Sequence, residues 1–257
     1  MTEELMQKQK VHIAILSLSL TFFGSGLLLS QKQNPFDNPA PSKSKSSRVQ
    51  HSSKKLQQEN AKEVLNKLGI AFTTEAFFEE VKKGNIQNVR LFITAGMNPD
   101  VRDSSHPLNP TALMHAAARD YVEIGSFLLK VGADKNARRL IDGGYSYCEE
   151  GPNEEGETKK WGNTVLMVAA GSGRPKMTSL LISAGADVHA VCRERRDANA
   201  LDDAMQFIIS PHDDKEEMTR ERRRDAFETI RLLLKAGADP NRPQGYDRYI
   251  PFTSLLT

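Results

Sequence analysis

The sequence predicts an all-α solenoid of about four helix–turn–helix repeats, preceded by an N-terminal hydrophobic helix and a flexible linker. Three observations support this: a short phrase recurs four times, an uncharged apolar run lies near the N-terminus, and a Pro- and Ser-rich segment separates the two. With 257 residues, of which 39% are hydrophobic and 26% charged, the chain can bury one sizeable core but is too polar to lie mostly within a membrane.

The recurring phrase ends an apolar run at a glycine, and its four copies read ITAGMNPD, LKVGADKN, ISAGADVH and LKAGADPN. The four glycines are Gly96, Gly132, Gly185 and Gly237. Their intervals of 36, 53 and 52 residues (132−96, 185−132, 237−185) fit a unit of about 33 residues with insertions. The last three units have adjacent leucines, at 128–129, 180–181 and 232–234. Only a neighbouring unit can bury them, so the units are expected to stack.

Two units follow a known pattern without a gap. Thr111–Ala117 opens a unit that Gly132–Asn136 closes, and Thr164–Ala170 opens one that Gly185–His189 closes. These segments resemble the ankyrin family, whose unit starts T-P-L-H-x-A and ends G-A-D-x-N. The resemblance implies a repeat domain over residues 73–257, with units at about 74–103, 108–138, 162–191 and 197–243 and a partial fifth unit at 248–257.

The units depart from the family pattern at the first helix. Ala112 and Val165 stand where the family has proline, although Thr111 and Thr164 can still cap the helix. Asp120 replaces the usual glycine between the two helices, and aspartate tolerates the left-handed backbone better than most residues.

Residues 1–10 form a short tail, and residues 11–30 a hydrophobic segment whose stretch 11–29 lacks charged side chains. At about 1.5 Å per residue, a helix of this length just spans a hydrocarbon core of about 30 Å. The expectation is an uncleaved single-pass anchor with the repeat domain outside the cytoplasm. A cleaved signal peptide, which would give a secreted or periplasmic protein, and a buried or peripheral helix are the alternatives. Basic residues flank both ends, so the positive-inside rule does not separate the orientations.

Residues 31–55 are rich in Pro, Ser, Asn, Gln and Lys, which predicts a disordered linker. In residues 56–72, apolar side chains at Leu56, Val64, Leu65 and Leu68 predict an amphipathic helix that ends near Gly69. We expect this helix to cap the N-terminal end of the repeat domain.

Two insertions lengthen the repeats. Residues 139–161 are acidic and contain Tyr145, Tyr147 and Trp161, which is typical either of a partner-contacting loop or of a solvated loop. Residues 206–224 lie inside the fourth unit, where Asp213 or Asp214 is expected to cap a lengthened second helix that runs to Lys235.

We call the connection between two consecutive units a finger. The ankyrin resemblance places partner contacts at finger positions, here Arg102, Asp103, Arg138, Arg139, Trp161, Arg193 and Arg195. The two cysteines, Cys148 and Cys192, fall in adjacent fingers and can form a disulfide if the domain is exported. In the cytoplasm they would remain thiols.

No catalytic, cofactor-binding or metal-binding residue is expected. The six histidines lack metal-ligand spacing, and His115 is expected to be a surface or partly buried side chain. A net charge of +2 provides no field for nucleic-acid binding. We therefore expect a membrane-tethered module that binds protein, with no nucleic-acid or small-molecule ligand. An inhibitor or immunity-type protein that blocks one enzyme is the alternative, and an enzyme with activity in the insertions is the weakest hypothesis.

Overall fold

The computed structural model describes residues 43–140, 148–149, 160–192, 198–209 and 219–241, with backbone only at 43–52, 140, 148–149 and 160–161. Contacts divide the chain into two compact units. The first comprises Met1–Phe72 and Thr94–Gly96, and the second Thr73–Ile93 and Met97–Thr257.

The first unit contains helix α2, Lys43–Lys67. It starts 13 residues before Leu56 (56−43), inside the segment whose composition predicts a linker. The sequence between Pro41 and Gly69 contains neither proline nor glycine, and its lysines are good helix formers. The predicted end is confirmed, because Gly69 has φ +71° and its N–H donates to the carbonyl of Asn66 at 2.9 Å.

Across the described part of the chain, no helix is long and apolar enough to cross a membrane. The hydrophobic segment 11–30 lies outside those residues, so the predicted membrane helix stays a prediction.

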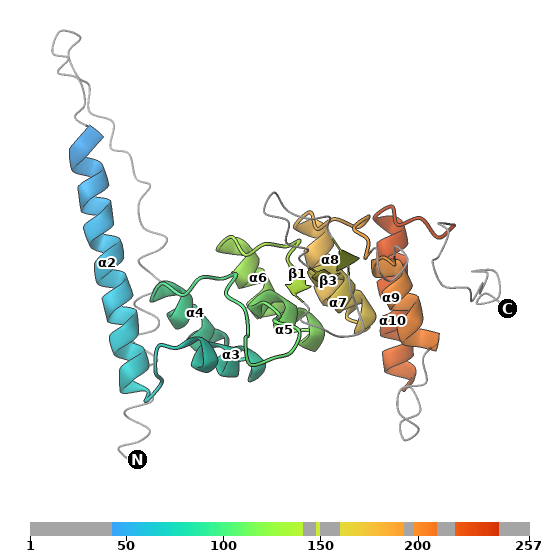
Figure 1. Ribbon diagram of the computed structural model, residues 1–257, viewed down its shortest axis with the longest axis horizontal. Coiled ribbons are helices and arrows are strands. Elements are labelled where there is room, and N and C mark those ends of the chain that lie inside the picture. Colours follow the sequence, from blue (N-terminus) through green and yellow to red (C-terminus); the bar gives the residue numbers. More distant parts are fainter. Residues whose placement is uncertain (1–42, 141–147, 150–159, 193–197, 210–218, 242–257) are drawn as a thin grey trace, which may run out of the picture. The chain divides into compact units, whose positions relative to one another are not determined.

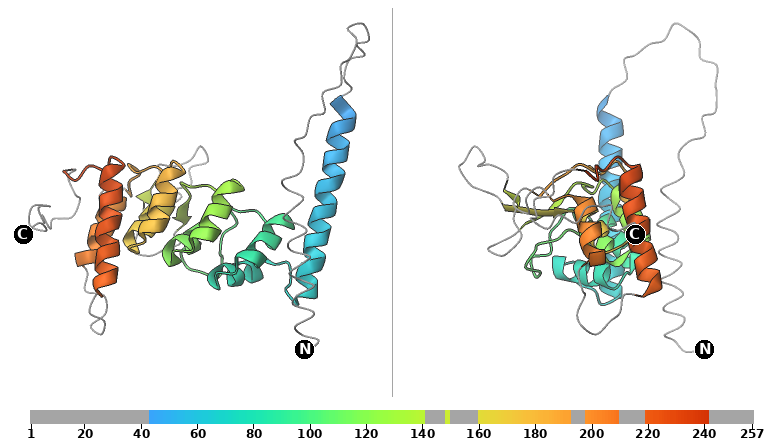
Figure 2. Two further views of the ribbon diagram at one scale, coloured as in Figure 1. Left: turned by 180° about the vertical axis from the view of Figure 1, so that it is seen from behind. Right: turned by 90° about the vertical axis from the view of Figure 1, so that its right-hand side faces the viewer.

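The second unit is a row of helix pairs, as Figures 1 and 2 show. The pairs are α3 (Thr74–Lys82) and α4 (Ile86–Thr94), α5 (Ala112–Arg119) and α6 (Val122–Lys130), α7 (Val165–Gly171) and α8 (Pro175–Ser183), and α9 (Ala200–Ile209) and α10 (Arg220–Lys235). The first helices pack in the order α3, α5, α7, α9, and the second helices α6, α8 and α10 pack on one another likewise. Stacked helical repeats are thus confirmed in this unit.

The repeat pattern also accounts for the core. In each of the last three repeats, one of the adjacent leucines is fully buried, namely Leu128, Leu181 or Leu233. Burying one leucine side chain contributes about 1.5–3 kcal/mol to stability. Alanines of the first helices, such as Ala116 and Ala169, are equally buried. Because their side chains are small, neighbouring first helices can approach closely.

The closing phrases of consecutive units are linked by hydrogen bonds. The N–H of Asp134 donates to Oδ1 of Asp100 at 2.8 Å, and the N–H of Asp187 donates to Oδ1 of Asn136 at 2.9 Å. The recurring Asp and Asn side chains therefore fix the spacing of the fingers.

The predicted helix caps at Thr111 and Thr164 are confirmed, and Asp120 adopts the predicted left-handed conformation. Thr111 and Thr164 accept hydrogen bonds from the N–H groups of Met114 at 3.4 Å and Met167 at 3.2 Å. Asp120 ends α5 in the left-handed conformation, with φ 59° and ψ 32°.

Asp120 also serves the next repeat. Its Oδ1 accepts a hydrogen bond from the N–H of Met177 at 3.2 Å, in the first turn of α8. The N-cap of α8, Arg174, makes no side-chain capping bond. The usual glycine could adopt the same backbone conformation but could not supply this acceptor.

Replacing Asp120 with alanine is expected to destabilise the domain by about 2 kcal/mol, because the left-handed backbone becomes strained and the cap of α8 is lost. Replacement with glycine removes the cap but relieves the strain, so a change below about 1 kcal/mol is expected. Urea unfolding of both variants measures the difference. Equal losses in the two variants would show that backbone strain plays no part.

The structure contains a small antiparallel sheet that the predicted all-α fold did not include. Its strands are β1 (Arg138–Leu140), β2 (Cys148–Glu149) and β3 (Lys160–Thr164), in the order β1-β3-β2. Arg138 pairs with Thr164, and Cys148 pairs with Trp161. The described ends of the 139–161 insertion are therefore strands anchored at α7, whereas residues 141–147 and 150–159 lie outside the described residues.

The second insertion ends differently from the prediction. Helix α10 starts at Arg220, and its N-cap is Thr219, whose hydroxyl accepts a hydrogen bond from the N–H of Arg222 at 3.2 Å. The predicted caps at Asp213 and Asp214, like the partial fifth unit at 248–257, fall outside the described residues. Threonine and aspartate are both favoured N-cap residues, so the residue type alone does not identify which of these positions starts the helix.

Candidate functional site

Two of the predicted partner contacts bind the protein's own backbone. Nη1 of Arg102, in the α4–α5 finger, donates to the carbonyl of Asn109 at 3.1 Å and to that of Arg138 at 2.9 Å. Nη1 of Arg138, in the α6–α7 finger, donates in turn to the carbonyl of Val191 at 3.0 Å. Each arginine thus holds its finger against the next one, and these guanidinium groups are engaged within the domain.

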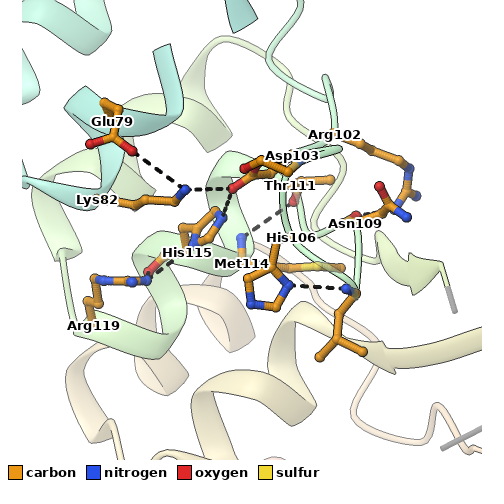
Figure 3. A network of polar contacts seen from close by, with 12 residues as sticks. Glu79, Lys82, Arg102, Asp103, His106, Asn109, Thr111, Met114, His115 and Arg119 are labelled. Atoms are coloured by element: carbon orange, nitrogen blue, oxygen red, sulfur yellow. Dashed lines mark hydrogen bonds and ion pairs between the residues drawn. The ribbon is translucent and has the colours of Figure 1, made fainter. Parts of the chain in front are cut away.

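Asp103 is buried rather than presented to a partner, with only 2% of its surface exposed. Its Oδ2 accepts hydrogen bonds from Nζ of Lys82 at 3.1 Å and from Nε2 of His115 at 3.0 Å (Figure 3). Its Oδ1 accepts a further hydrogen bond from the hydroxyl of Ser105. These partners come from α3, α5 and the finger, so the carboxylate joins the first two repeats.

His115 is buried too, with 5% of its surface exposed, which corrects the expectation of a surface or partly buried side chain. Nε2–H donates to Asp103, and Nδ1 accepts from Nη1 of Arg119 at 3.1 Å (Figure 3). Protonation of Nδ1 would place its N–H against the N–H donor of Arg119, which disfavours the charged form of His115. Burial, and then the positive charges of Arg119 and Lys82, lower the pKa of His115 to about 4, although Asp103 opposes the shift.

Stability is expected to fall as the solution is acidified below about pH 6.5, the unfolded-state pKa of histidine. The pKa of His115 is lower in the folded state than in the unfolded state. Neutral His115 therefore contributes its full share of stability above about pH 6.5, and this contribution disappears as pH falls towards about 4. Between about pH 8 and pH 5 the loss is roughly 2 kcal/mol by linkage. Urea unfolding across this range tests it, and His115→Gln should show a shallower dependence. An identical dependence in that variant would contradict the assignment to His115.

A hollow of about 220 Å³ lies against α7, α9 and the small sheet. Its polar lining residues include Arg139, Asn163, Asp203 and Gln206, and its apolar ones include Met167 and Phe207. Helix α7 packs directly on α9 here, so two repeats and one finger form the site.

Arg139 differs from the other predicted contacts whose side chains are described. Its Nε is buried and has no hydrogen-bond partner within the described structure. Burial lowers the pKa of Arg139, and the negative charge of Asp203 opposes that shift. Asp203 is itself buried, at 6% exposed, and accepts a hydrogen bond from Nδ2 of Asn163 at 3.1 Å.

Sequence reasoning identified Arg139 but missed Asp203, Asn163 and Gln206. One signal was present in the sequence. Asp203 occupies the position of the repeat pattern, T-P-L-H-x-A, that His115 occupies in the second unit, where x is variable. A polar residue at that position in two units marks the side of the first helices that bears the polar clusters.

The remaining predicted contacts are described only in part. The backbone of Trp161 pairs with Leu140 and Cys148, whereas its side chain, Arg193 and Arg195 lie outside the described residues. Cys192 is fully buried and disulfide-bonded. The sequence has one other cysteine, Cys148, whose side chain is not among those described, so their pairing stays a prediction.

The comparisons agree with the repeat geometry. Residues 77–192 match the family model of ankyrin repeats in three copies, a segment that contains most of α3 and all helices through α8. No curated protein matches the chain. This segment is therefore similar to ankyrin repeats, which generally serve as protein–protein interaction modules. Among the described side chains, no group of three His, Cys, Asp or Glu residues could hold a metal ion.

Proposed function

We propose that the repeat domain is a membrane-tethered protein-binding module whose partner docks on the first helices and fingers around Arg139. The observation that carries this is the hollow between two neighbouring helical repeats, lined by a guanidinium whose buried Nε has no partner in the described structure. Arginine and aromatic side chains, phenylalanine among them, are enriched in protein–protein interfaces relative to the rest of the surface. Arg139 and Phe207 provide that combination.

The interactions that hold the fingers and helices around Arg139 in place also support this surface as the binding site. Arg102 and Arg138 fix successive fingers through backbone carbonyls, and α7 is held between α5 and α9. A surface that is ordered before binding loses little conformational entropy when a partner docks.

Capture of a partner tests the binding function. The full-length chain with a C-terminal tag, crosslinked in the cells that express it, is expected to recover one protein reproducibly. Arg139→Glu should reduce recovery at least about tenfold, because it reverses the charge in the recess. Arg231→Glu is the matched control, since Arg231 lies on α10 and pairs with Glu228 at the surface. Equal loss in both variants, or no recovered protein, would count against the proposal.

The membrane tether is tested separately. Residues 11–30 are the proposed anchor, and their hydrophobic length supports it. Alkaline extraction is expected to leave the full-length chain in the membrane pellet and to release a chain lacking these residues. Protease added to intact cells or spheroplasts should digest the repeat domain if it is extracytoplasmic. A protected domain would place it on the cytoplasmic side, and release of the full-length chain would exclude the tether.

The identity of the captured protein distinguishes an adaptor from the alternative, an inhibitor or immunity-type protein. If the partner is an enzyme, its activity is measured with the purified chain and with Arg139→Glu. Inhibition by the first and not by the second would favour the inhibitor.

A further inference from the structure

Helix α10 is longer than the second helices of the other repeats. Helices α4, α6 and α8 each begin 10 residues before the glycine that closes their repeat (96−86, 132−122, 185−175), whereas α10 begins 17 residues before Gly237 (237−220). The difference, residues Arg220–Ala226, adds about two turns to the helix, and the length of α10 is visible in Figure 1. We call these residues the α10 extension.

The extension adds little to the packing of the repeats. Residues 220–224 are all exposed, and burial begins only at Ala226, so the hydrophobic gain from these turns is small. The extension is still held in place, because Thr219 caps it and the guanidinium of Arg222 lies 5.7 Å from the ring centroid of Phe207 on α9. An ordered, exposed helical segment loses little conformational entropy when another molecule docks on it.

One side of the extension carries positive charge beside an exposed aromatic ring. Arg220, Arg223 and Phe227 are spaced i, i+3 and i+7, so they lie along one stripe of α10. Phe227 is 46% exposed. Arg224 pairs with acidic residues of its own helix, whereas Arg220 and Arg223 pair with no acidic side chain in the described structure. The stripe therefore has two arginines whose charge no neighbour compensates.

The charge of the stripe selects an acidic occupant. A second copy of the chain that brought the same stripe would place arginine against arginine, and like charges repel. Residues 242–257 follow α10 in the sequence, but they contain one acidic residue, Asp247, and two arginines. They do not complement the stripe either, which leaves an acidic partner molecule as the matching occupant.

The spacing of the arginines favours a helix of a protein as that partner. Side chains three or four residues apart on a helix lie about 5–6 Å apart, so carboxylates at the same spacing on a second helix can each meet one arginine in a bidentate pair. A membrane or a nucleic acid presents a broader anionic surface. Such a surface would also meet Glu221, Asp225 and Glu228, which follow another side of α10, and would be repelled there.

We propose that Arg220, Arg223 and Phe227 form a docking site for an acidic amphipathic helix of a partner protein. The two arginines bind carboxylates of that helix, and Phe227 contacts its apolar side chains. This site is separate from the surface around Arg139, so it adds a second contact to the proposed function and does not depend on the first.

The test uses a synthetic helix in place of the unidentified partner. A fluorescein-labelled peptide of Glu-Glu-Ala-Leu repeats is titrated with the full-length chain, and the fluorescence anisotropy of the peptide is measured. Saturable binding is expected, at least about tenfold tighter than that of a neutral peptide of Gln-Gln-Ala-Leu repeats. Equal binding of the two peptides, or no saturation with the acidic one, would overturn the inference.

Variants locate the binding on the extension. Arg223→Glu should weaken binding of the acidic peptide at least about tenfold, because it reverses one of the two uncompensated charges. Phe227→Ala should weaken it at least about threefold through lost apolar contact. Lys176→Glu is the matched control, since it makes the same change of charge at an exposed position of α8. Circular dichroism checks that each variant folds, and equal weakening by Arg223→Glu and Lys176→Glu would reject the site.

Two further measurements identify other occupants of the stripe. Vesicles of phosphatidylglycerol should leave the acidic peptide bound, and displacement of the peptide would assign the stripe to an anionic membrane surface. Sedimentation should give the same mass for the wild type and for Arg223→Glu. A wild-type dimer that this variant dissociates would assign the stripe to a second copy of the chain. Either result would contradict the proposal.

Discussion

Replacing Asp103 with alanine is expected to destabilise the repeat domain by about 3 kcal/mol. The carboxylate is buried and accepts hydrogen bonds from Lys82, His115 and Ser105. Removing it leaves the Nε2–H of His115 without its acceptor and Lys82 without its closest anion. Breaking a buried ion pair by removing one partner costs about 3–5 kcal/mol. The lower value applies because Lys82 is 28% exposed and can turn towards water.

Glu79→Gln is the matched control for Asp103→Ala. Glu79 pairs with the same lysine, at 3.8 Å, but its side chain is 60% exposed, so its loss should change stability by less than about 1 kcal/mol. Urea unfolding of both variants gives the comparison. If Asp103→Ala were no more destabilising than Glu79→Gln, the buried cluster would contribute little to holding the first two repeats together.

The sequence was sufficient for those features of the fold that depend on local chemistry. The spacing of the glycines identified the repeats, Thr111 and Thr164 marked helix starts, and Gly69 marked the end of α2. Each of these residues acts within one turn of its own position. The beginning of α2 was missed because a Lys- and Ser-rich stretch has the composition of a linker and yet contains no helix breaker.

The candidate site was predicted only in part, because it depends on contacts between distant residues. Arg102 and Arg138 were expected to face a partner, but each reaches a carbonyl of the next finger, 36 and 53 residues away. Periodicity places such residues on a finger without showing which neighbour they will meet. Arg139 and Asp203 are 64 residues apart (203−139), and only the stacking of α7 on α9 brings them to one hollow.

Reduction of the disulfide at Cys192 is expected to destabilise the domain by about 2–4 kcal/mol, the usual contribution of a native disulfide. We propose Cys148 as the partner, because it is the other cysteine of the chain and its strand, β2, pairs with β3 in the α6–α7 finger, which is adjacent to the finger that contains Cys192. A bond between them would close a loop of 45 residues (192−148+1). Thermal unfolding with and without a reductant measures the loss.

Cys148→Ser is the informative variant, because it removes the proposed bond and leaves the buried Cys192 sulfur in place. Its stability without reductant should equal that of the reduced wild type, and adding reductant should change it no further. Peptide mapping of the oxidised chain should give one linked pair of peptides, which contain Cys148 and Cys192. A reductant-sensitive stability in the variant, or a covalent dimer of the wild type, would show that Cys192 bonds to another chain. A bond within the chain would instead support export of the domain, because structural disulfides persist in oxidising compartments.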